Sequence, residues 1–435
     1  MKHVIIVGGG FAGFHCARKL AAHNDVRITL IDRNNYQQFQ PLLYQVAAGF
    51  LAPSNVAYSL RNLLVPYPSV EVKMDKVVSA DLKTCTVTTM HGMTYQGDIL
   101  VLAAGSQANF FGTPGADQFS LPLYSLHDAE RLRSRILGVF EGADRDPSVI
   151  QKGALNFVLV GAGPTGTEMA GTLGDMIHHA LKMEYPKLPI EHTGIHIVDM
   201  GHAVLSAFSP KAQAYAAQKL EERGVQIHLG IAVKEVGEGH VLLSDGERIQ
   251  THTAIWAGGL RASTLSGNLS VPPGHGGRID VEPDLTVKGF PQVYALGDFA
   301  NIPDQEGKPL PQLASVAEQA GNWCARNIMA DINGEAKKPF QYLDKGIMAM
   351  IGRSAAVAEV GPHHHELQGP IAFAAWLGVH AALLTTRQAK IEAFVEWAWD
   401  YFSAVKGDQV LDRFREEKID WDADLPPGET QASTS

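Results

Sequence analysis

Paired cysteines, surplus positive charge and long apolar runs are all missing from this chain of 435 residues. Its three cysteines, Cys16, Cys85 and Cys324, lie far apart and form no Cys-x-x-Cys or Cys-x-x-x-x-Cys pair. We therefore expect no disulfide framework and a cytosolic chain. Two-electron relay through a pair of thiols is excluded as well, because that chemistry needs two neighbouring cysteines.

The charge balance and the short apolar runs exclude further classes. With 46 acidic and 36 basic residues the net charge is −10, so no basic surplus can neutralise phosphates, which argues against nucleic acid as a partner. No uncharged apolar run reaches the roughly 18 residues that a membrane-spanning helix requires. Residues 4–7 are apolar, but they lead into a glycine motif and therefore predict a strand rather than a signal peptide. The length suits two or three domains of roughly 100–200 residues each.

The first glycine motif is VIIVGGGFAG at residues 4–13, where Gly8-x-Gly10-x-x-Gly13 follows a short β-branched run. The run predicts a buried parallel strand, and FHCARKLAAH predicts the helix after it. The first glycine permits the tight turn, the second lets the backbone approach a pyrophosphate, and the third lets helix and strand pack closely. The next strand ends in Asp32, 19 residues after Gly13, where a carboxylate accepts from a ribose hydroxyl. This segment is predicted to bind a dinucleotide.

The second glycine motif, VLVGAGPTGTEMAG at residues 158–171, repeats this plan of apolar strand, three glycines and helix. The following strand carries Asp199, 33 residues after Gly166, and the extra length lies in the Pro-containing connector KMEYPKLPIEH. A carboxylate at this position favours a free ribose 2′-hydroxyl and repels a 2′-phosphate, so NADH is expected rather than NADPH. Two sites for two nucleotides are the simplest interpretation.

Three later segments share one pattern, an apolar strand that ends in small residues. They are DILVLAAGSQANFFGTPG at 98–115, TAIWAGGL at 253–260 and QVYALGDFA at 292–300. In the last, Gly297 and Asp298 follow the strand, and such an aspartate either bonds a nucleotide hydroxyl or only caps the next segment. Together these segments repeat one plan after each glycine motif.

The two glycine motifs, these strand ends and the late Gly-Asp resemble the flavoproteins that have two dinucleotide-binding domains. Further stretches are similar to one branch of them, the type II NADH:quinone oxidoreductases. They are GAGPTGTEMAG and residues 30–49, 313–321, 342–360 and 372–384. The resemblance covers nearly the whole chain and implies an α/β fold with two Rossmann-like doubly wound domains, one for FAD and one for NADH. Disulfide reductases and sulfide:quinone oxidoreductases share this plan, but they need the paired cysteines that this chain lacks.

The expected domain boundaries follow from this resemblance. Residues 1–115 and 290–340 would form a discontinuous FAD domain, and residues 116–289 would form the NADH domain inserted into it. Residues 341–423 would form a C-terminal amphipathic region in contact with membrane and quinone. Residues 424–435 are polar and are expected to be a disordered tail.

The resemblance also implies roles for individual residues. The residues that would hold FAD are Gly8, Gly10, Phe11, Ala12, Gly13, Asp32, Arg33, Ala104, Gly105, Gly297, Asp298 and Ala317. The residues that would hold NADH are Gly163, Pro164, Thr165, Gly166, Asp199, Ala257 and Gly258. Glu168 would give polar support near where nicotinamide meets flavin, and Gln319 would do so beside the quinone face of the flavin. Ser315 departs from the Gln or Pro that the family often has there.

The C-terminal region contains an apolar run at 371–384, which His380 interrupts and which is too short to span a bilayer. The next segment, 390–406, predicts an amphipathic helix with Trp397 and Trp399 at the two borders of its apolar face, a position that suits the lipid headgroup level. Such a helix packs on a core or a dimer partner, or it lies on a membrane. Its acidic polar face is unusual for lipid contact, whereas the resemblance favours a peripheral position on the cytoplasmic face of the cell inner membrane.

The activity implied by the resemblance is that NADH reduces FAD, which then reduces a membrane quinone without proton pumping, with Trp376 and His380 at the quinone mouth. Two alternatives stay open at this point. One is a soluble NAD(P)H-dependent reductase of an iron–sulfur protein or of oxygen, and the other is a flavin-bound redox sensor that signals through dimerisation. A homodimer is possible in each case. The run HHH at 363–365 lies in a Gly/Pro-bounded loop without a partner cluster, so no metal site is expected.

Overall fold

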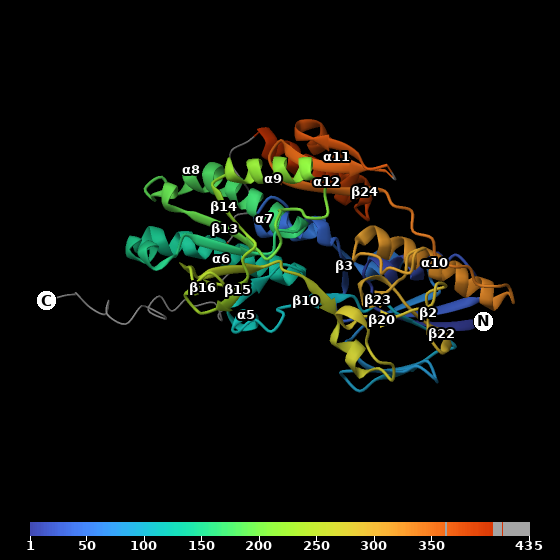
Figure 1. The fold of residues 1–435 in the computed structure, drawn as a ribbon. Coiled ribbons are helices and arrows are strands. Elements are labelled where there is room, and N and C mark those ends of the chain that lie inside the picture. Colours follow the sequence, from blue (N-terminus) through green and yellow to red (C-terminus); the bar gives the residue numbers. More distant parts are fainter. Residues whose placement is uncertain (362, 403–410, 412–435) are drawn as a thin grey trace. The chain divides into compact units, whose positions relative to one another are not determined.

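The computed structural model describes residues 1–361, 363–402 and 411 (Figure 1). The chain divides into two compact units. Unit 1 consists of Met1–Gln38, Ala57–Gln107 and Leu260–Asp344, and unit 2 of Phe39–Val56, Ala108–Gly259 and the described chain from Lys345 onwards. The end of the expected helix at 390–406 and the whole expected tail at 424–435 lie outside the described residues.

These units differ from the expected domain boundaries by a few residues at 108–115 and 341–344 and by three longer segments. The segment that begins at Leu260 belongs to unit 1, because Leu265 and Leu285 are buried in the core of that unit. The short segment Phe39–Val56 and the C-terminal region both belong to unit 2. Contacts between residues distant in sequence define these units, and local sequence does not display such contacts.

Unit 1 is built on a mainly parallel sheet. Its strands in spatial order are β21 (Thr286–Val287), β22 (Phe290–Ala295), β9 (Ile99–Leu102), β1 (Lys2–Val7), β2 (Val26–Asp32) and β5 (Val70–Met74). Its helices are α1 (Phe11–Leu20), α4 (Leu60–Leu64) and α10 (Ala314–Ile332). Helices α1 and α10 pack closely because Gly321 has no side chain, and a Cβ there would overlap the Ala12 carbonyl oxygen. The strand order reverses between β1 and β9, which is where sheets of this kind bind ligands.

Unit 2 repeats this plan with a second parallel sheet. Its strands in spatial order are β11 (Ser120–Pro122), β18 (Thr253–Trp256), β12 (Asn156–Val160), β13 (Gly194–Asp199) and β14 (Val225–Leu229). The order reverses between β12 and β18, as it does between β1 and β9. The helices before the C-terminal region are α2 (Leu43–Ala47), α3 (Pro53–Val56), α5 (Ala116–Phe119), α6 (Leu126–Arg145), α7 (Pro164–Asp175), α8 (Lys182–Glu184) and α9 (Pro210–Glu221).

The repeat extends to the connections of the two sheets. Each unit places an antiparallel meander before the strand that returns beside the first one. The meanders are β6 (Val77–Asp81), β7 (Thr86–Thr89) and β8 (Thr94–Gln96) in unit 1, and β15 (Val233–Val236), β16 (His240–Leu243) and β17 (Arg248–Gln250) in unit 2. Short strand pairs complete the fold: β3 (Tyr36–Gln38) with β4 (Ala57–Ser59), β20 (Ile279–Asp280) with β23 (Ala300–Asn301), and β10 (Ser106–Ala108) with β19 (Leu260–Ala262). The two glycine motifs therefore belong to two copies of one architecture.

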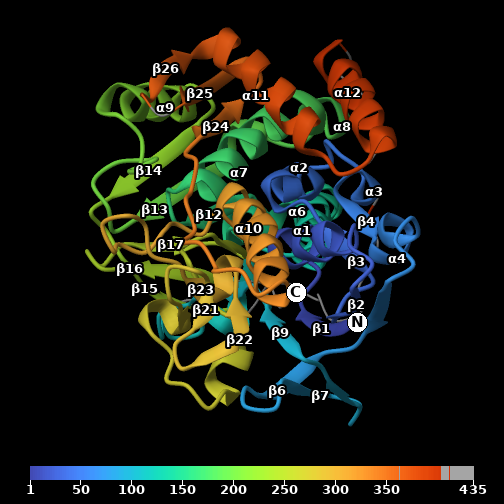
Figure 2. The same cartoon turned by 90° about the vertical axis from the view of Figure 1, so that its right-hand side faces the viewer.

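The C-terminal part of unit 2 is an antiparallel sheet followed by two helices. The strands are β24 (Gly346–Gly352), β25 (Ala355–Val360) and β26 (His365–Gln368), and the helices are α11 (Gly369–Leu383) and α12 (Arg387–Phe402). Figure 2 shows β24 against α7, where Gly171 allows a close approach because a Cβ would overlap the Ile351 carbonyl oxygen. None of the described helices combines the length and the apolar character that crossing a bilayer requires.

Candidate functional site

Each glycine motif lies in the turn between a parallel strand and a helix, β1 to α1 in unit 1 and β12 to α7 in unit 2. The first glycines, Gly8 and Gly161, have φ of +100° and +104°, which side-chain-bearing residues rarely adopt. The third glycines, Gly13 and Gly166, lie so close to the first that a Cβ would overlap the carbonyl oxygen of the first. The packing of the protein itself therefore requires two glycines in each motif.

The middle glycines, Gly10 and Gly163, are not explained by packing. Both have extended backbone angles that any residue adopts, and a Cβ on either would have no described protein atom within 4 Å. Each precedes the first turn of a helix that no side chain of the described residues caps. A phosphate bound to the free N–H groups of that turn accounts for the glycine, because a side chain would take the place of the phosphate. The two loops therefore fit two dinucleotides.

The strand-end carboxylates Asp32 and Asp199 hold these loops in the same way. Each accepts one hydrogen bond from its glycine loop and one from the chain that follows its strand, at 2.6–2.7 Å. The donors are the N–H groups of Gly9 and Asn34 for Asp32, and of Ala162 and Gly201 for Asp199. Burial raises the pKa of Asp32, and the two N–H groups and Arg33 offset only part of the rise. A carboxylate has about four acceptor positions, so both residues retain capacity for ribose hydroxyls.

Further expected FAD residues gather in unit 1 around the start of α10. A Cβ on Gly297 would lie 3.1 Å from the methyl group of Ala12 and 3.4 Å from that of Ala317. Asp298 accepts a hydrogen bond from the Ser106 hydroxyl at 2.8 Å. The start of α10 also carries the partial positive charge of a helix N-terminus, which favours an anion nearby. These contacts bring residues from α1, β10, the turn after β22 and α10 to one place, which agrees with a shared role in holding FAD.

The remaining expected residues flank the two loops. Phe11 opens α1, Pro164 and Thr165 open α7, and Arg33 follows β2. A Cβ on Gly8 would lie 3.3 Å from Ala104 Cα, and a Cβ on Gly161 would lie 2.8 Å from Gly258 Cα. Ala103–Ala104 in unit 1 and Ala257–Gly258 in unit 2 therefore occupy equivalent places beside their loops, and the expected Gly105 follows one residue later.

Glu168 is buried on α7, two residues after Gly166, the third glycine of the second motif. Its Oε1 accepts a hydrogen bond from the N–H of Met350 on β24 at 3.2 Å. Burial raises the pKa of Glu168 to about 8, and the N–H groups of Met350 and of the neighbouring Trp376 indole offset only part of the rise. At neutral pH this carboxyl is mainly the uncharged acid and carries a proton.

Trp376 and His380, the residues expected at the quinone mouth, lie beside Glu168 on α11 and are both buried. Their rings stack with centroids 3.9 Å apart. His380 Nδ1 lies 2.9 Å from the Trp376 carbonyl oxygen, so Nδ1 carries the proton and Nε2 is left as an acceptor. Burial lowers the pKa of His380 to about 4, and the bond to the carbonyl opposes this shift only weakly. The imidazole is therefore neutral at pH 7.

Two polar residues of α2, Tyr44 and Gln45, complete this buried cluster, and sequence reasoning did not single them out. Tyr44 packs edge-on against Trp376, and Gln45 Nε2 donates to the Tyr44 hydroxyl at 3.2 Å. The pKa of Tyr44 is raised well above its usual value by burial and then by the Glu168 carboxyl. The available signal was a Tyr-Gln pair inside the otherwise apolar PLLYQVAAG.

The expectation for Trp397 is wrong. Instead of lying at the border of an exposed apolar face, Trp397 is buried, and its indole N–H donates to Gln45 Oε1 at 2.7 Å. The buried side of α12 consists of Ala389, Ala393 and Trp397, spaced by four residues. A hydrogen-bond partner from a distant part of the sequence decides this orientation. Trp399, in contrast, is 65% exposed.

Other apolar residues of α12 are exposed. Ile391, Phe394 and Val395 are 58–65% exposed, and Ile371, Val379 and Leu383 of α11 are exposed as well. The two helices are consecutive and contact each other. They therefore present apolar side chains outward, in contrast to an ordinary helix packed on a core.

Gln319 belongs to unit 1, as do the expected FAD residues, whereas Glu168, Trp376 and His380 belong to unit 2. Both amide atoms of Gln319 are bonded to the backbone of Leu343, Nε2 to the carbonyl at 3.0 Å and Oε1 to the N–H at 2.9 Å. One turn earlier, Ser315 Oγ lies 2.9 Å from the Tyr342 hydroxyl. Ser315 and Gln319 thus hold the segment that leads out of unit 1.

The histidine run at 363–365 lies at the turn between β25 and β26, and His364 Nδ1 lies 3.3 Å from Glu359 Oε2. Among the described residues, no group of three or more His, Cys, Asp or Glu side chains could hold a metal ion. Cys16, Cys85 and Cys324 are free and buried.

Comparisons with known proteins agree with this arrangement. A family model described as pyridine nucleotide-disulphide oxidoreductase matches residues 2–321. The chain is 36% identical to the type II NADH:quinone oxidoreductase Ndh of Mycobacterium tuberculosis, over 94% of this chain and 90% of that protein. It is 31% identical to the type II NADH:quinone oxidoreductase of Staphylococcus aureus, over 82% of this chain and 90% of that protein.

Solved structures show the same fold at lower identity. The NDH2 of Plasmodium falciparum in complex with NADH has a TM-score of 0.83 at 19% identity, covering 93% of this chain and 99% of its own. The sulfide:quinone oxidoreductase of Aquifex aeolicus has a TM-score of 0.71 at 19% identity, covering 93% and 96%.

Proposed function

The chain belongs to the type II NADH:quinone oxidoreductases, and from that membership we propose that it oxidises NADH and reduces a membrane quinone with FAD as its cofactor. The overall reaction consumes NADH, one proton and the quinone, and yields NAD⁺ and the quinol. FAD, when bound, supplies the redox chemistry, since it takes up a hydride and gives out two electrons. The residues of the chain bind the two nucleotides, orient them and supply a proton.

The glycine loop of unit 1 is proposed to hold FAD, with Asp32 at the ribose and Asp298 at a further hydroxyl or phosphate-linked group. The loop of unit 2 is proposed to hold NADH. Asp199 supports NADH over NADPH, because a 2′-phosphate would meet a carboxylate there. The residues after Asp199 are Met200, Gly201 and His202, and they include no arginine or lysine to pair with that phosphate.

Glu168 is proposed to hold the proton that quinone reduction requires. Its Oε1 accepts the Met350 N–H, so the proton of the neutral acid resides on Oε2. A pKa of about 8 keeps the proton on Glu168 at neutral pH, yet it is close enough to 7 that Glu168 can donate the proton and later take up another. His380 cannot replace it as a donor at pH 7, since its imidazole is neutral and its Nδ1 proton is bonded to a carbonyl.

The observation that carries this proposal is the pair of loops with unexplained middle glycines, Gly10 and Gly163, followed by the buried acid Glu168. The test is to follow flavin absorbance without oxygen while adding NADH or NADPH and then a short-chain quinone. We expect bleaching by NADH, much slower bleaching by NADPH and full return with quinone. A protein without flavin, or a reduced flavin that quinone does not reoxidise, would exclude the proposed reaction.

We further propose that the exposed apolar side chains of α11 and α12 rest on the lipid surface of the cytoplasmic face of the cell inner membrane. A quinone with an apolar tail resides in lipid, so an enzyme that reduces it must contact the membrane surface. Phe394→Glu with Val395→Glu should abolish binding to phospholipid vesicles, whereas Val65→Glu, an exposed valine of unit 1, should leave it unchanged. Unchanged vesicle binding together with loss of a dimer in sedimentation would assign this face to a second copy of the chain instead.

A further inference from the structure

Helix α7 carries a second buried carboxylate besides Glu168. Asp175 ends the helix, seven residues after Glu168. Residues seven apart complete nearly two turns, so both side chains lie on the same face of α7. That face meets β24 (Figure 2).

Both carboxylates accept hydrogen bonds from the backbone of the same hairpin. Glu168 Oε1 accepts the N–H of Met350 at 3.2 Å, and Asp175 Oδ2 accepts the N–H of Arg353 at 2.6 Å. Seven helical residues rise about 10.5 Å. Three strand residues span about 10 Å, which matches that rise. Strand β24 is at the edge of its sheet, so Glu168 occupies an N–H group that the edge would otherwise leave open. Asp175 binds the N–H of Arg353 in the turn that follows the strand.

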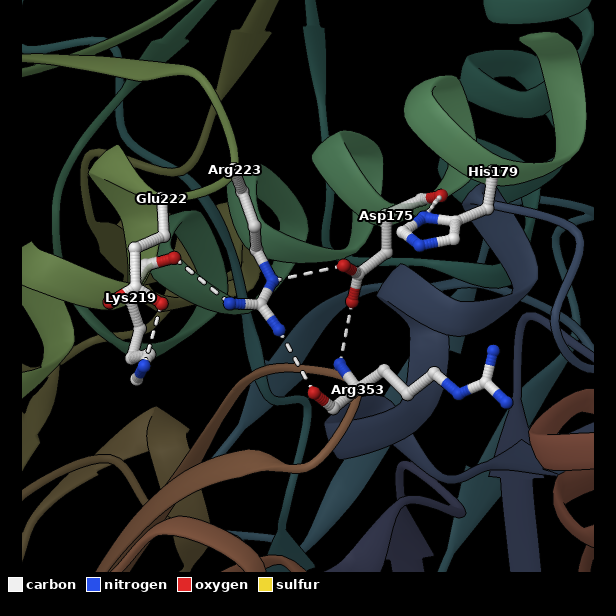
Figure 3. A network of polar contacts seen from close by, with 6 residues as sticks. All are labelled: Asp175, His179, Lys219, Glu222, Arg223 and Arg353. Atoms are coloured by element: carbon white, nitrogen blue, oxygen red, sulfur yellow. Dashed lines mark hydrogen bonds and ion pairs between the residues drawn. The ribbon is translucent and has the colours of Figure 1, made fainter.

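Arg223, just beyond the end of α9, connects Asp175 to the hairpin through hydrogen bonds to both (Figure 3). Its Nε donates to Asp175 Oδ1 at 3.0 Å, its Nη2 to the Arg353 carbonyl at 2.9 Å and its Nη1 to the Lys219 carbonyl at 3.0 Å. Both backbone groups of Arg353 are thus fixed, one by Asp175 and one by Arg223. Gly352 is required beside them, since a Cβ there would overlap the Arg223 guanidinium.

The helix changes its hydrogen-bonding pattern at this point. A π-helical turn, Met176–Leu181, follows Asp175 directly. The Asp175 carbonyl accepts a bond from His179 Nδ1 at 3.0 Å (Figure 3). Such turns are rare and occur often at functional sites. Asp175 is therefore held at its carbonyl by His179 and at its carboxylate by Arg223 and the Arg353 N–H.

We propose that Asp175 and Arg223 are a positioning pair, which fixes the register of β24 along α7 and thereby holds the Met350 N–H against Glu168. The proposal rests on the role of Glu168 in the proposed function. The pair itself is assigned no contact with NADH, FAD or quinone. It acts through the hairpin alone.

The groups that face Glu168 determine what a shift of β24 would do. They are Tyr44 from α2, the Met350 N–H from β24 and the Trp376 indole from α11, with the neutral His380 stacked behind Trp376. Among these, the Met350 N–H is the backbone donor that stabilises the ionised carboxylate. Its withdrawal favours the protonated form, so the pKa of Glu168 rises.

The test compares Asp175→Asn and Arg223→Lys with the parent holoenzyme. In Asp175→Asn the side-chain NH2 group faces either Arg223 Nε or the Arg353 N–H, so one of the two hydrogen bonds is lost. Arg223→Lys keeps the positive charge but lacks the guanidinium N–H that bonds the Arg353 carbonyl. Glu222→Gln is the matched control, because that exposed carboxylate bonds Gln218 and Lys219 of its own helix. Two readouts are needed: amide hydrogen exchange of the peptide containing Met350, and the pH profile of NADH:quinone turnover.

In Asp175→Asn we expect roughly tenfold faster exchange at Met350 and an apparent pKa of turnover that is higher by about 1, the scale of one hydrogen bond to a charged group. Arg223→Lys should show a smaller change in the same direction, and Glu222→Gln none. Parental exchange and a parental pH profile in a folded Asp175→Asn or Arg223→Lys would overturn the proposal. Failure of the proposed function would give a different result from failure of the positioning proposal. The parent would then not reduce quinone, whereas amide hydrogen exchange at Met350 could still be compared between the variants and the parent.

Discussion

Gln319 and Leu343 exchange two hydrogen bonds, with the side-chain amide of the first pairing with both backbone groups of the second. An amide that pairs with a backbone in this way substitutes for a neighbouring strand. It holds the segment just before Lys345, where the chain leaves unit 1. The residue expected to face the quinone therefore also has a structural task.

Replacing Gln319 should release this segment. Gln319→Ala removes two hydrogen bonds worth about 1 kcal/mol each, so opening of the segment should become roughly thirtyfold more frequent. The measurement is the rate of tryptic cleavage after Lys345 under native conditions. Ser315→Ala, which removes the single bond to Tyr342, should give a smaller increase. Equal rates for all three proteins would show that the pairing does not restrain the segment.

Glu168→Gln should change the pH dependence of stability. A folded-state pKa of about 8 lies above the usual value of 4.5, so the parent loses stability as pH rises from about 4.5 to 8 and has its full stability below that window. The loss amounts to a few kcal/mol, because each pH unit between the two pKa values corresponds to ~1.4 kcal/mol. The glutamine does not ionise and keeps an oxygen for the Met350 N–H.

Melting temperatures measured from pH 5 to pH 8 test this expectation. The difference between Glu168→Gln and the parent should widen steadily in favour of the variant, while quinone turnover of the variant falls. The exposed Glu222→Gln should follow the parent throughout. A constant difference between the curves would mean that Glu168 is already ionised at low pH.

Replacing each of the two tryptophans of α12 by phenylalanine should have effects of different size on stability. Trp397→Phe removes the indole N–H and leaves Gln45 Oε1 buried without its donor, which costs about 1–3 kcal/mol. Trp399→Phe alters an exposed ring and should change stability by less than about 0.5 kcal/mol. Thermal unfolding of both variants tests this difference. Equal melting temperatures would contradict the buried hydrogen bond between Trp397 and Gln45.

Two helical glycines provide a similar contrast. Gly171→Ala would place a methyl group on the Ile351 carbonyl oxygen and force β24 away from α7, so we expect loss of stability and a shift in the pH profile of turnover. Gly138→Ala on α6 meets no described atom within 4 Å and should stabilise by up to about 1 kcal/mol through helix propensity. If both changes were neutral, the close contact between α7 and β24 would not hold in solution.

The features predicted correctly from the sequence are those with a local cause. A glycine motif between an apolar strand and a helix has one geometry, so spacing alone predicts both nucleotide loops and their strand-end carboxylates. The α/β fold with two doubly wound domains was implied by the resemblance. The missing cysteine pair excluded thiol relay for an equally local reason. The resemblance added the type of reaction, which the comparisons support.

Features that depend on partners distant in the chain could not be predicted from the sequence, because they arise only when the chain folds. Trp397 points inward because Gln45, far away in sequence, accepts its indole N–H. Glu168 has a raised pKa because β24 and α11 remove it from water. Asp175 acquires a role only where Arg223 and the Arg353 backbone meet it. Periodicity reports which face of a helix is apolar, but burial and hydrogen-bond partners decide what that face touches.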